Sequence, residues 1–147
     1  MFSHILVTCV GNICRSPMAE ALLRHHCTSH ISHHLEIRSA GIHALIGHPA
    51  DPLAEQLMTE CGLDISQHRG QKLSPQLVQW ADIILVMEQE HKRYIESRNP
   101  TARGKVFRLL EDEKRDIPDP YQQDKDAFSK ALTLIQKGVE EWVIKLS

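Results

Sequence analysis

Residues 5–7 form an apolar run, and the ten residues after it read TCVGNICRSP. A short apolar run is typical of a strand buried in a parallel sheet. A serine followed by a proline is typical of the first turn of a helix, and here these are Ser16 and Pro17. The chain must therefore pass from a buried strand to a helix through one short loop, which begins at a cysteine, Cys9, and ends at an arginine, Arg15.

Along the rest of the chain, short apolar runs alternate with segments in which apolar residues recur every three or four positions, as in a helix. This pattern predicts an α/β fold: a single small doubly wound domain over residues 1–147, with a four-stranded parallel sheet flanked by helices. The expected strands cover about residues 4–8, 35–39, 83–87 and 105–110. The expected helices cover about residues 16–27, 53–61, 88–97 and 125–145, with a short one opening at residues 74–75.

Composition excludes several classes of function. The net charge is −2 with no long run of one sign, so general affinity for nucleic acid or an anionic membrane surface is not expected. We see no signal peptide before the first strand and no stretch of transmembrane length, so membrane insertion is not expected. Four cysteines without an export signal favour reduced thiols and a cytoplasmic location.

The first loop combines groups that suit a tetrahedral oxyanion. Cys9 lies just past the carboxyl end of the first strand, where doubly wound sheets bind ligands. Backbone N–H groups, the guanidinium of Arg15 and a helix N-terminus would surround it, and all three favour an anion and the thiolate form of Cys9. Gly11 and Asn12 tolerate a positive φ. The expected phosphate-binding residues are Val10, Gly11, Asn12, Ile13, Cys14 and Ser16.

Each of these residues has a plainer interpretation. A cysteine alone is commonly a small buried hydrophobe. Arg15 could be a surface residue, although a cation opposes the dipole at a helix N-terminus unless an anion binds there. Ser16 fits two roles equally: an N-cap of the helix, or a hydroxyl that stabilises the Cys9 thiolate.

The Cys-x5-Arg-Ser-Pro order at residues 9–17 resembles the loop of the low-molecular-weight protein tyrosine phosphatases. Two later segments resemble landmarks of the same family in the same order, Ser39-Ala40-Gly41 and Asp119-Pro120-Tyr121. The resemblance covers essentially the whole chain. It implies a protein-tyrosine-phosphatase domain that needs neither a metal nor a cofactor.

The resemblance also implies a division of roles. Cys9 would attack phosphorus and form a cysteinyl-phosphate intermediate, while Arg15 and the loop amides stabilise charge on the equatorial oxygens. Asp119 resembles the general acid that protonates the leaving phenolate and then activates a water. Taken alone, an aspartate before a proline is typical of a turn.

Further positions match residues that support the loop in this family. Asn12, Ser39 and His68 match residues that brace it by hydrogen bonds, and ordinary polar loop residues are the alternative for Ser39 and His68. Cys14 matches a second loop cysteine. It either traps oxidised Cys9 as a reversible disulfide or is structural.

The substrate class follows from the expected pocket walls. Ile13, Leu45 and Tyr121 would offer apolar contact to a flat phenyl ring, which favours phosphotyrosine. Leu45, and Gln122 after Tyr121, resemble the bacterial enzymes that are paired with tyrosine kinases of capsule or exopolysaccharide export. The implied partner is a phosphotyrosine-containing protein, in particular an autophosphorylated kinase of that kind.

Four other functions share some of these features. Protein arginine phosphatases resemble this scaffold but carry a threonine where this loop has Ile13. Arsenate reductases on it use later cysteines, and this chain has none after Cys61. A cysteine phosphocarrier and an inactive phosphate-binding module are the remaining alternatives, and Arg15 and Asp119 argue against the carrier because they promote transfer to water.

The remaining histidines and cysteines receive structural interpretations. Five histidines crowd residues 25–34, and zinc binding is conceivable there, but an exposed helix end and loop fits better because metal-ligand spacing is lacking. We expect no metal site. Cys27 and Cys61 are expected to pack in or near the core.

Overall fold

The computed structural model describes residues 2–147. Strands and helices alternate along this range, as the apolar pattern predicts. The elements in chain order are β1 (His4–Cys9), α1 (Arg15–His30), β2 (Glu36–Gly41), α2 (Pro52–Glu60), α3 (Pro75–Trp80), β3 (Ile83–Val86), α4 (Gln89–Arg98), the 3₁₀ turn η1 (Pro100–Ala102), β4 (Val106–Arg108) and α5 (Lys125–Leu146).

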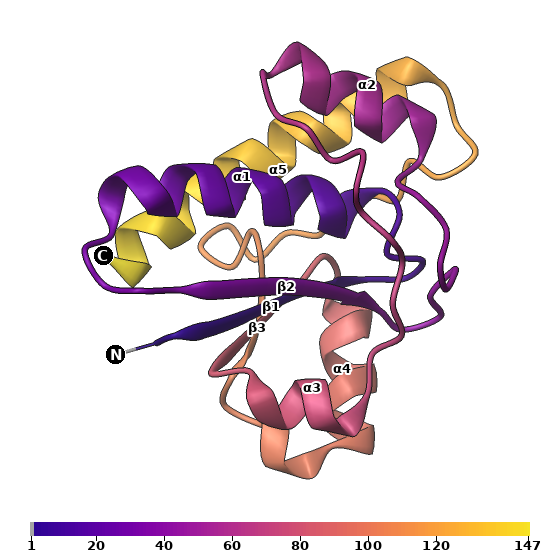
Figure 1. The fold of residues 1–147 in the computed structure, drawn as a ribbon. Coiled ribbons are helices and arrows are strands. Elements are labelled where there is room, and N and C mark those ends of the chain that lie inside the picture. Colours follow the sequence, from indigo (N-terminus) through magenta and orange to yellow (C-terminus); the bar gives the residue numbers. More distant parts are fainter. Residues whose placement is uncertain (1) are drawn as a thin grey trace.

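The four strands form one parallel sheet in the order β2-β1-β3-β4. Helices α1, α2 and α5 cover one face of the sheet, and α3 and α4 cover the other (Figure 1). The four-stranded doubly wound fold expected from the sequence is therefore confirmed.

Alternate residues of the central strands point to two separate cores. In β1, Ile5 and Val7 pack against α1 and α5, while Leu6 packs on the opposite face. Burial on both faces explains why the strands read as unbroken apolar runs. On α5 the buried residues recur every three or four positions, and this stripe closes the larger core: Phe128, Leu132, Ile135, Val139, Trp142 and Leu146.

The order of the strands decides where a ligand can bind. The chain leaves β1 toward α1 on one face and leaves the adjacent β3 toward α4 on the other. Loops that diverge in this way leave a crevice at the carboxyl ends of the two strands. The loop that begins at Cys9 lies at this edge, as do the residues just after β3.

Two local expectations are corrected. Cys61 is exposed, not near the core. Its spacing from Leu57 and Met58 suggested the apolar stripe of α2, but the helix ends at Glu60 and the chain turns away at Gly62, which has a φ of +79°. Helix α1 begins at Arg15, one residue before the expected cap, and runs on to His30.

Candidate active site

The backbone of residues 9–14 is turned so that its carbonyl groups point away from the centre of the loop. Each of the six carbonyl oxygens accepts a hydrogen bond from a donor outside this segment. In order along the loop, these donors are the backbone N–H groups of Ile42, His43 and Leu45, the ring Nε2 of His68, and the backbone N–H groups of Asp51 and Met18. Within residues 2–147, the N–H groups of residues 11–14 donate to no other group. These N–H groups therefore face inward and can bind an anion.

Asn12 holds the loop in this shape. Its φ is 59°, the left-handed conformation that asparagine tolerates, whereas Gly11 does not adopt it. The buried side chain donates to Ser16 Oγ at 2.7 Å and to Ser39 Oγ at 3.0 Å. Its Oδ1 accepts from the backbone of Gln71 at 2.9 Å. The structure thus brings Ser39 and His68, both singled out from the sequence, into contact with the loop.

Ser16 contacts the sulfur of Cys9 and does not act as the helix N-cap. The two atoms, Cys9 Sγ and Ser16 Oγ, lie 2.9 Å apart in a fully buried setting. Because Ser16 Oγ already accepts a hydrogen bond from Asn12, its own proton is free to point at the sulfur. Of the two roles that the sequence left open, the structure supports a hydroxyl that stabilises a thiolate.

Arg15 is only 1% exposed and is held at one end. Its Nη1 donates to Glu88 Oε2 at 2.6 Å and to the carbonyl oxygen of Ile117 at 2.7 Å. Its Nε and Nη2 are buried and have no hydrogen-bond partner. A buried guanidinium with two unpaired donors is costly by itself, and a phosphoryl group could accept from both nitrogens. The arrangement fixes the cation while leaving two donors for a ligand.

Asp119 reaches the same site from the distant segment before α5. Its Oδ2 lies 3.5 Å from Arg15 Nη2, and its side chain is 41% exposed. Its Oδ1 accepts from the backbone N–H of Tyr121 at 3.1 Å, which fixes the turn. The segment is anchored to the sheet where Ile117 N donates to Met87 O. The carboxylate therefore lies at the mouth of the site, where it can reach both a ligand and solvent.

A small cavity of about 120 Å³ joins these groups. The buried residues Cys9 and Arg15 line it, and most of the lining is apolar. The lining residues are Cys9, Val10, Gly11, Ile13, Cys14, Arg15, His43, Leu45, Asp119 and Tyr121. The expected wall residues Leu45 and Tyr121 both line this cavity, and its combination of charged and apolar groups suits a phosphate with an attached ring.

Two residues of this region were missed from the sequence. Glu88 lies two residues past the end of β3, the strand beside β1, so its position at the carboxyl edge could have indicated a role. His43 follows β2 and lines the cavity, with its ring edge-on to Tyr94 at a centroid distance of 5.8 Å. Neither residue belongs to a local sequence motif. Each lies near the loop only because β2 and β3 are the neighbours of β1 in the sheet.

The cysteines differ in environment. Burial, reinforced by the nearby carboxylate of Asp51, raises the pKa of the Cys14 thiol far above its ordinary range. Burial also raises the pKa of Cys27, which packs in the core as expected. Both side chains are therefore protonated at neutral pH.

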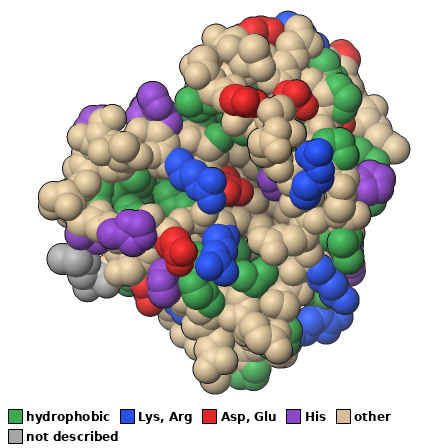
Figure 2. All heavy atoms as spheres, viewed as in Figure 1, with side chains coloured by type: hydrophobic (Ala, Val, Ile, Leu, Met, Phe, Trp, Pro, Cys, Tyr) green, Lys and Arg blue, Asp and Glu red, His purple; other side chains and the backbone are tan. Residues whose placement is uncertain are grey.

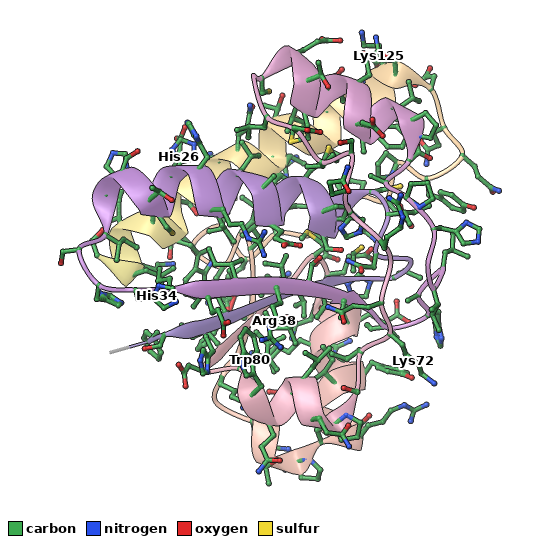
Figure 3. The ribbon with its side chains drawn as sticks, viewed as in Figure 1. His26, His34, Arg38, Lys72, Trp80 and Lys125 are labelled. Carbon is green, nitrogen blue, oxygen red and sulfur yellow. The ribbon has the colours of Figure 1, made fainter. Side chains whose placement is uncertain are left out.

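The five histidines of residues 25–34 lie on the last turns of α1 and in the loop that leads to β2. Side chains of histidines gather over the end of α1 and the start of β2 (Figure 2). His26 projects from one side of α1, whereas His34 lies on the other side near β2 (Figure 3). Among residues 2–147, no three side chains of His, Cys, Asp or Glu lie close enough together to hold one metal ion.

No helix within residues 2–147 has both the length and the apolar character needed to span a bilayer.

A thiol at the centre of inward-facing amides, beside a buried arginine and at the edge of a doubly wound sheet, defines a cysteine-dependent phosphatase. The family comparison identifies which kind. Residues 4–147 match the model of the family described as low molecular weight phosphotyrosine protein phosphatase. The chain belongs to this family.

Relatives cover nearly the full length of the chain. It is 51% identical over 146 residues to the probable low molecular weight protein-tyrosine-phosphatase EpsP of Ralstonia nicotianae, covering 99% of this chain and 97% of that protein. The structure of Vibrio vulnificus Wzb in complex with benzylphosphonate superposes with a TM-score of 0.92 at 40% identity, covering 99% of this chain and 100% of that one. The YwlE arginine phosphatase from Geobacillus stearothermophilus superposes with a TM-score of 0.89 at 32% identity, covering 98% of this chain and 92% of that one.

Proposed function

We propose that this protein hydrolyses phosphotyrosine in proteins through a phosphate ester of Cys9. The observation that carries the proposal is the loop of residues 9–14, whose carbonyls all point outward, together with Arg15, which has two unpartnered nitrogens and lines the same cavity as the Cys9 thiol. Such preorganised donors stabilise the charge of a phosphoryl group in transfer without any reorganisation at the moment of reaction.

The reaction has two steps. In the first, the Cys9 thiolate attacks phosphorus in line, the bond to the phenolic oxygen breaks, and Asp119 gives its proton to the leaving oxygen. In the second, the ionised Asp119 takes a proton from a water, which attacks phosphorus and releases Cys9 as a thiolate. The hydroxyl of Ser16, 2.9 Å from the sulfur, stabilises that thiolate as nucleophile and as leaving group. Asn12, Ser39 and His68 support the loop throughout.

The proposed partner is an autophosphorylated bacterial tyrosine kinase of exopolysaccharide or capsule export. Support comes from the relative named EpsP and from the pocket walls at Leu45 and Tyr121, which suit a phenyl ring. A reducing compartment such as the cytoplasm fits four free cysteines and a reaction that needs a thiolate.

Turnover of synthetic phosphopeptides tests this function directly. We expect hydrolysis of p-nitrophenyl phosphate and of a phosphotyrosine peptide in the presence of a metal chelator. We expect at least ~10-fold lower kcat/KM on the matched phosphoserine peptide, because its phosphorus stands closer to the backbone and its side chain forgoes the apolar ring contact. Absence of turnover on every substrate would favour an inactive phosphate-binding module or a carrier.

Ile13 is the residue expected to discriminate against phosphoarginine. It is buried in the cavity wall and offers no hydrogen-bond partner to a guanidinium. We expect Ile13→Thr to raise kcat/KM on a phosphoarginine peptide by ~10-fold, the effect of about one added hydrogen bond. Ile13→Val, which has the shape of threonine without the hydroxyl, should bring no such gain. Wild-type activity on phosphoarginine equal to that on phosphotyrosine would instead favour an arginine phosphatase.

Cys14 is expected to protect Cys9 from irreversible oxidation, since both cysteines line the same cavity. Peroxide converts the Cys9 thiolate to a sulfenic acid, and the Cys14 thiol then forms a disulfide with it and releases water. We expect dithiothreitol to restore most of the activity of the wild type and of the exposed-cysteine control Cys61→Ser, but little of that of Cys14→Ser. Equal recovery of all three proteins would leave Cys14 with a structural role only.

A further inference from the structure

His91 is a buried titratable residue that takes no part in the reaction steps above. It lies on α4 and is 6% exposed. Its Nε2 is 3.4 Å from Glu88 Oε2, the same oxygen that accepts the 2.6 Å hydrogen bond from Arg15 Nη1. Its backbone N–H donates to the carbonyl oxygen of Glu88 at 3.0 Å. The ring, the carboxylate and the guanidinium thus form a row that ends in the phosphate-binding loop.

The surroundings of His91 keep its ring neutral. Burial lowers the pKa of His91, and the charge of Arg15 lowers it further. The negative charges of three carboxylates, Glu88, Glu90 and Asp116, raise the pKa and so oppose this shift. Since Nδ1 is buried without any partner and Nε2 faces a carboxylate, we assign the proton of the neutral ring to Nε2.

This position lets His91 control the direction of the Glu88 carboxylate. The side chain of Glu88 is 26% exposed, so water can compete with Arg15 for its oxygens. The ring of His91 packs against Oε2 and offers it a positive N–H edge, which favours the orientation toward Arg15. Without that hold, Arg15 can shift toward Asp119, whose Oδ2 is already 3.5 Å from Nη2. The nitrogen that a phosphoryl group needs would then be engaged by a carboxylate.

We propose that His91 is a positioning residue for phosphate binding, which acts by holding Glu88 against Arg15 and so keeps the two unpaired nitrogens of Arg15 available. The proposal rests on the proposed function, because it assigns Arg15 to the phosphoryl group.

Calorimetric titration with inorganic phosphate tests this role without requiring turnover. We expect His91→Phe to raise the Kd for phosphate roughly 5- to 10-fold, as when one charge-assisted hydrogen bond weakens. Two variants with the same amide group but different side-chain lengths show whether the group at position 91 must reach the Glu88 carboxylate. The amide of His91→Gln can occupy the place of Nε2 and should stay within ~2-fold of wild type. The shorter amide of His91→Asn cannot, and should weaken binding as His91→Phe does. Ile95→Val, a buried change elsewhere on α4, controls for helix packing.

A double-mutant cycle shows whether the effect passes through Glu88. In a Glu88→Gln background, the change His91→Phe should alter the Kd by less than ~2-fold, because the carboxylate it positions is absent. An equally large loss in that background would overturn the proposal, as would an unchanged Kd for folded His91→Phe. If His91→Phe does not fold, the comparison of His91→Asn with His91→Gln decides, and equal Kd values for the two overturn the proposal.

Failure of this inference differs from failure of the proposed function. If the protein hydrolyses phosphotyrosine but the Kd for phosphate does not change when His91 is substituted, the role of His91 is refuted and the proposed function stands. If the Kd for phosphate depends on His91 but the protein hydrolyses no substrate, the role of His91 stands and the proposed function is refuted. A wild-type protein that binds no phosphate overturns both.

Discussion

Cys9→Ser is expected to lower kcat for aryl phosphates by more than about 10³-fold and to leave phosphate binding in place. A serine hydroxyl does not ionise near neutral pH, and it is a far weaker nucleophile than a thiolate. Phosphate binding depends instead on the loop amides and Arg15, which the substitution does not touch. Steady-state kinetics with p-nitrophenyl phosphate and calorimetry with inorganic phosphate measure the two quantities separately.

Cys61→Ser is the matched control, because it makes the same chemical change at an exposed position outside the cavity. It should leave both kcat and the Kd for phosphate unchanged. A Cys9→Ser protein that keeps a tenth of the wild-type kcat would remove Cys9 from the role of nucleophile.

Asp119→Asn is expected to slow poor leaving groups far more than good ones. We expect kcat/KM for phenyl phosphate to fall by ~10²-fold or more, because the phenolate must be protonated as it departs. For p-nitrophenyl phosphate, whose leaving group is stable as an anion, we expect a loss below ~10-fold. The asparagine Oδ1 can still accept from Tyr121 N, so the turn that carries residue 119 should persist.

The quantity compared is kcat/KM, because it reports the steps up to formation of the phosphoenzyme and excludes the later hydrolysis. Asp126→Asn, an exposed change on α5 whose carboxylate pairs only with Lys130 in the described structure, serves as the control and should leave both substrates unaffected. An equal loss for leaving groups of widely different pKa would argue against Asp119 as the general acid.

The central loop could be predicted from the sequence because its parts are contiguous. Cys9, Arg15 and Ser16 lie within eight residues of chain, between a strand and a helix whose positions follow from apolar periodicity. That short connection leaves few ways to arrange a thiol, a set of amides and a helix N-terminus. Ser39, His68 and Asp119 lie far along the chain, and only the family resemblance connected them with the loop.

Only the tertiary structure shows which side chains from distant parts of the sequence meet at the carboxyl edge of the sheet. Glu88 and His91 follow β3. Glu88 contacts Arg15, and His91 contacts Glu88, because β3 pairs with β1, a consequence of strand order that no local pattern encodes. The role of Ser16 was likewise undecided until its contacts were known, since a hydroxyl can cap a helix or face a sulfur. The hydrogen bond from Asn12 and the 2.9 Å approach to Cys9 selected the second, because direction and distance are properties of packed side chains and not of residue types.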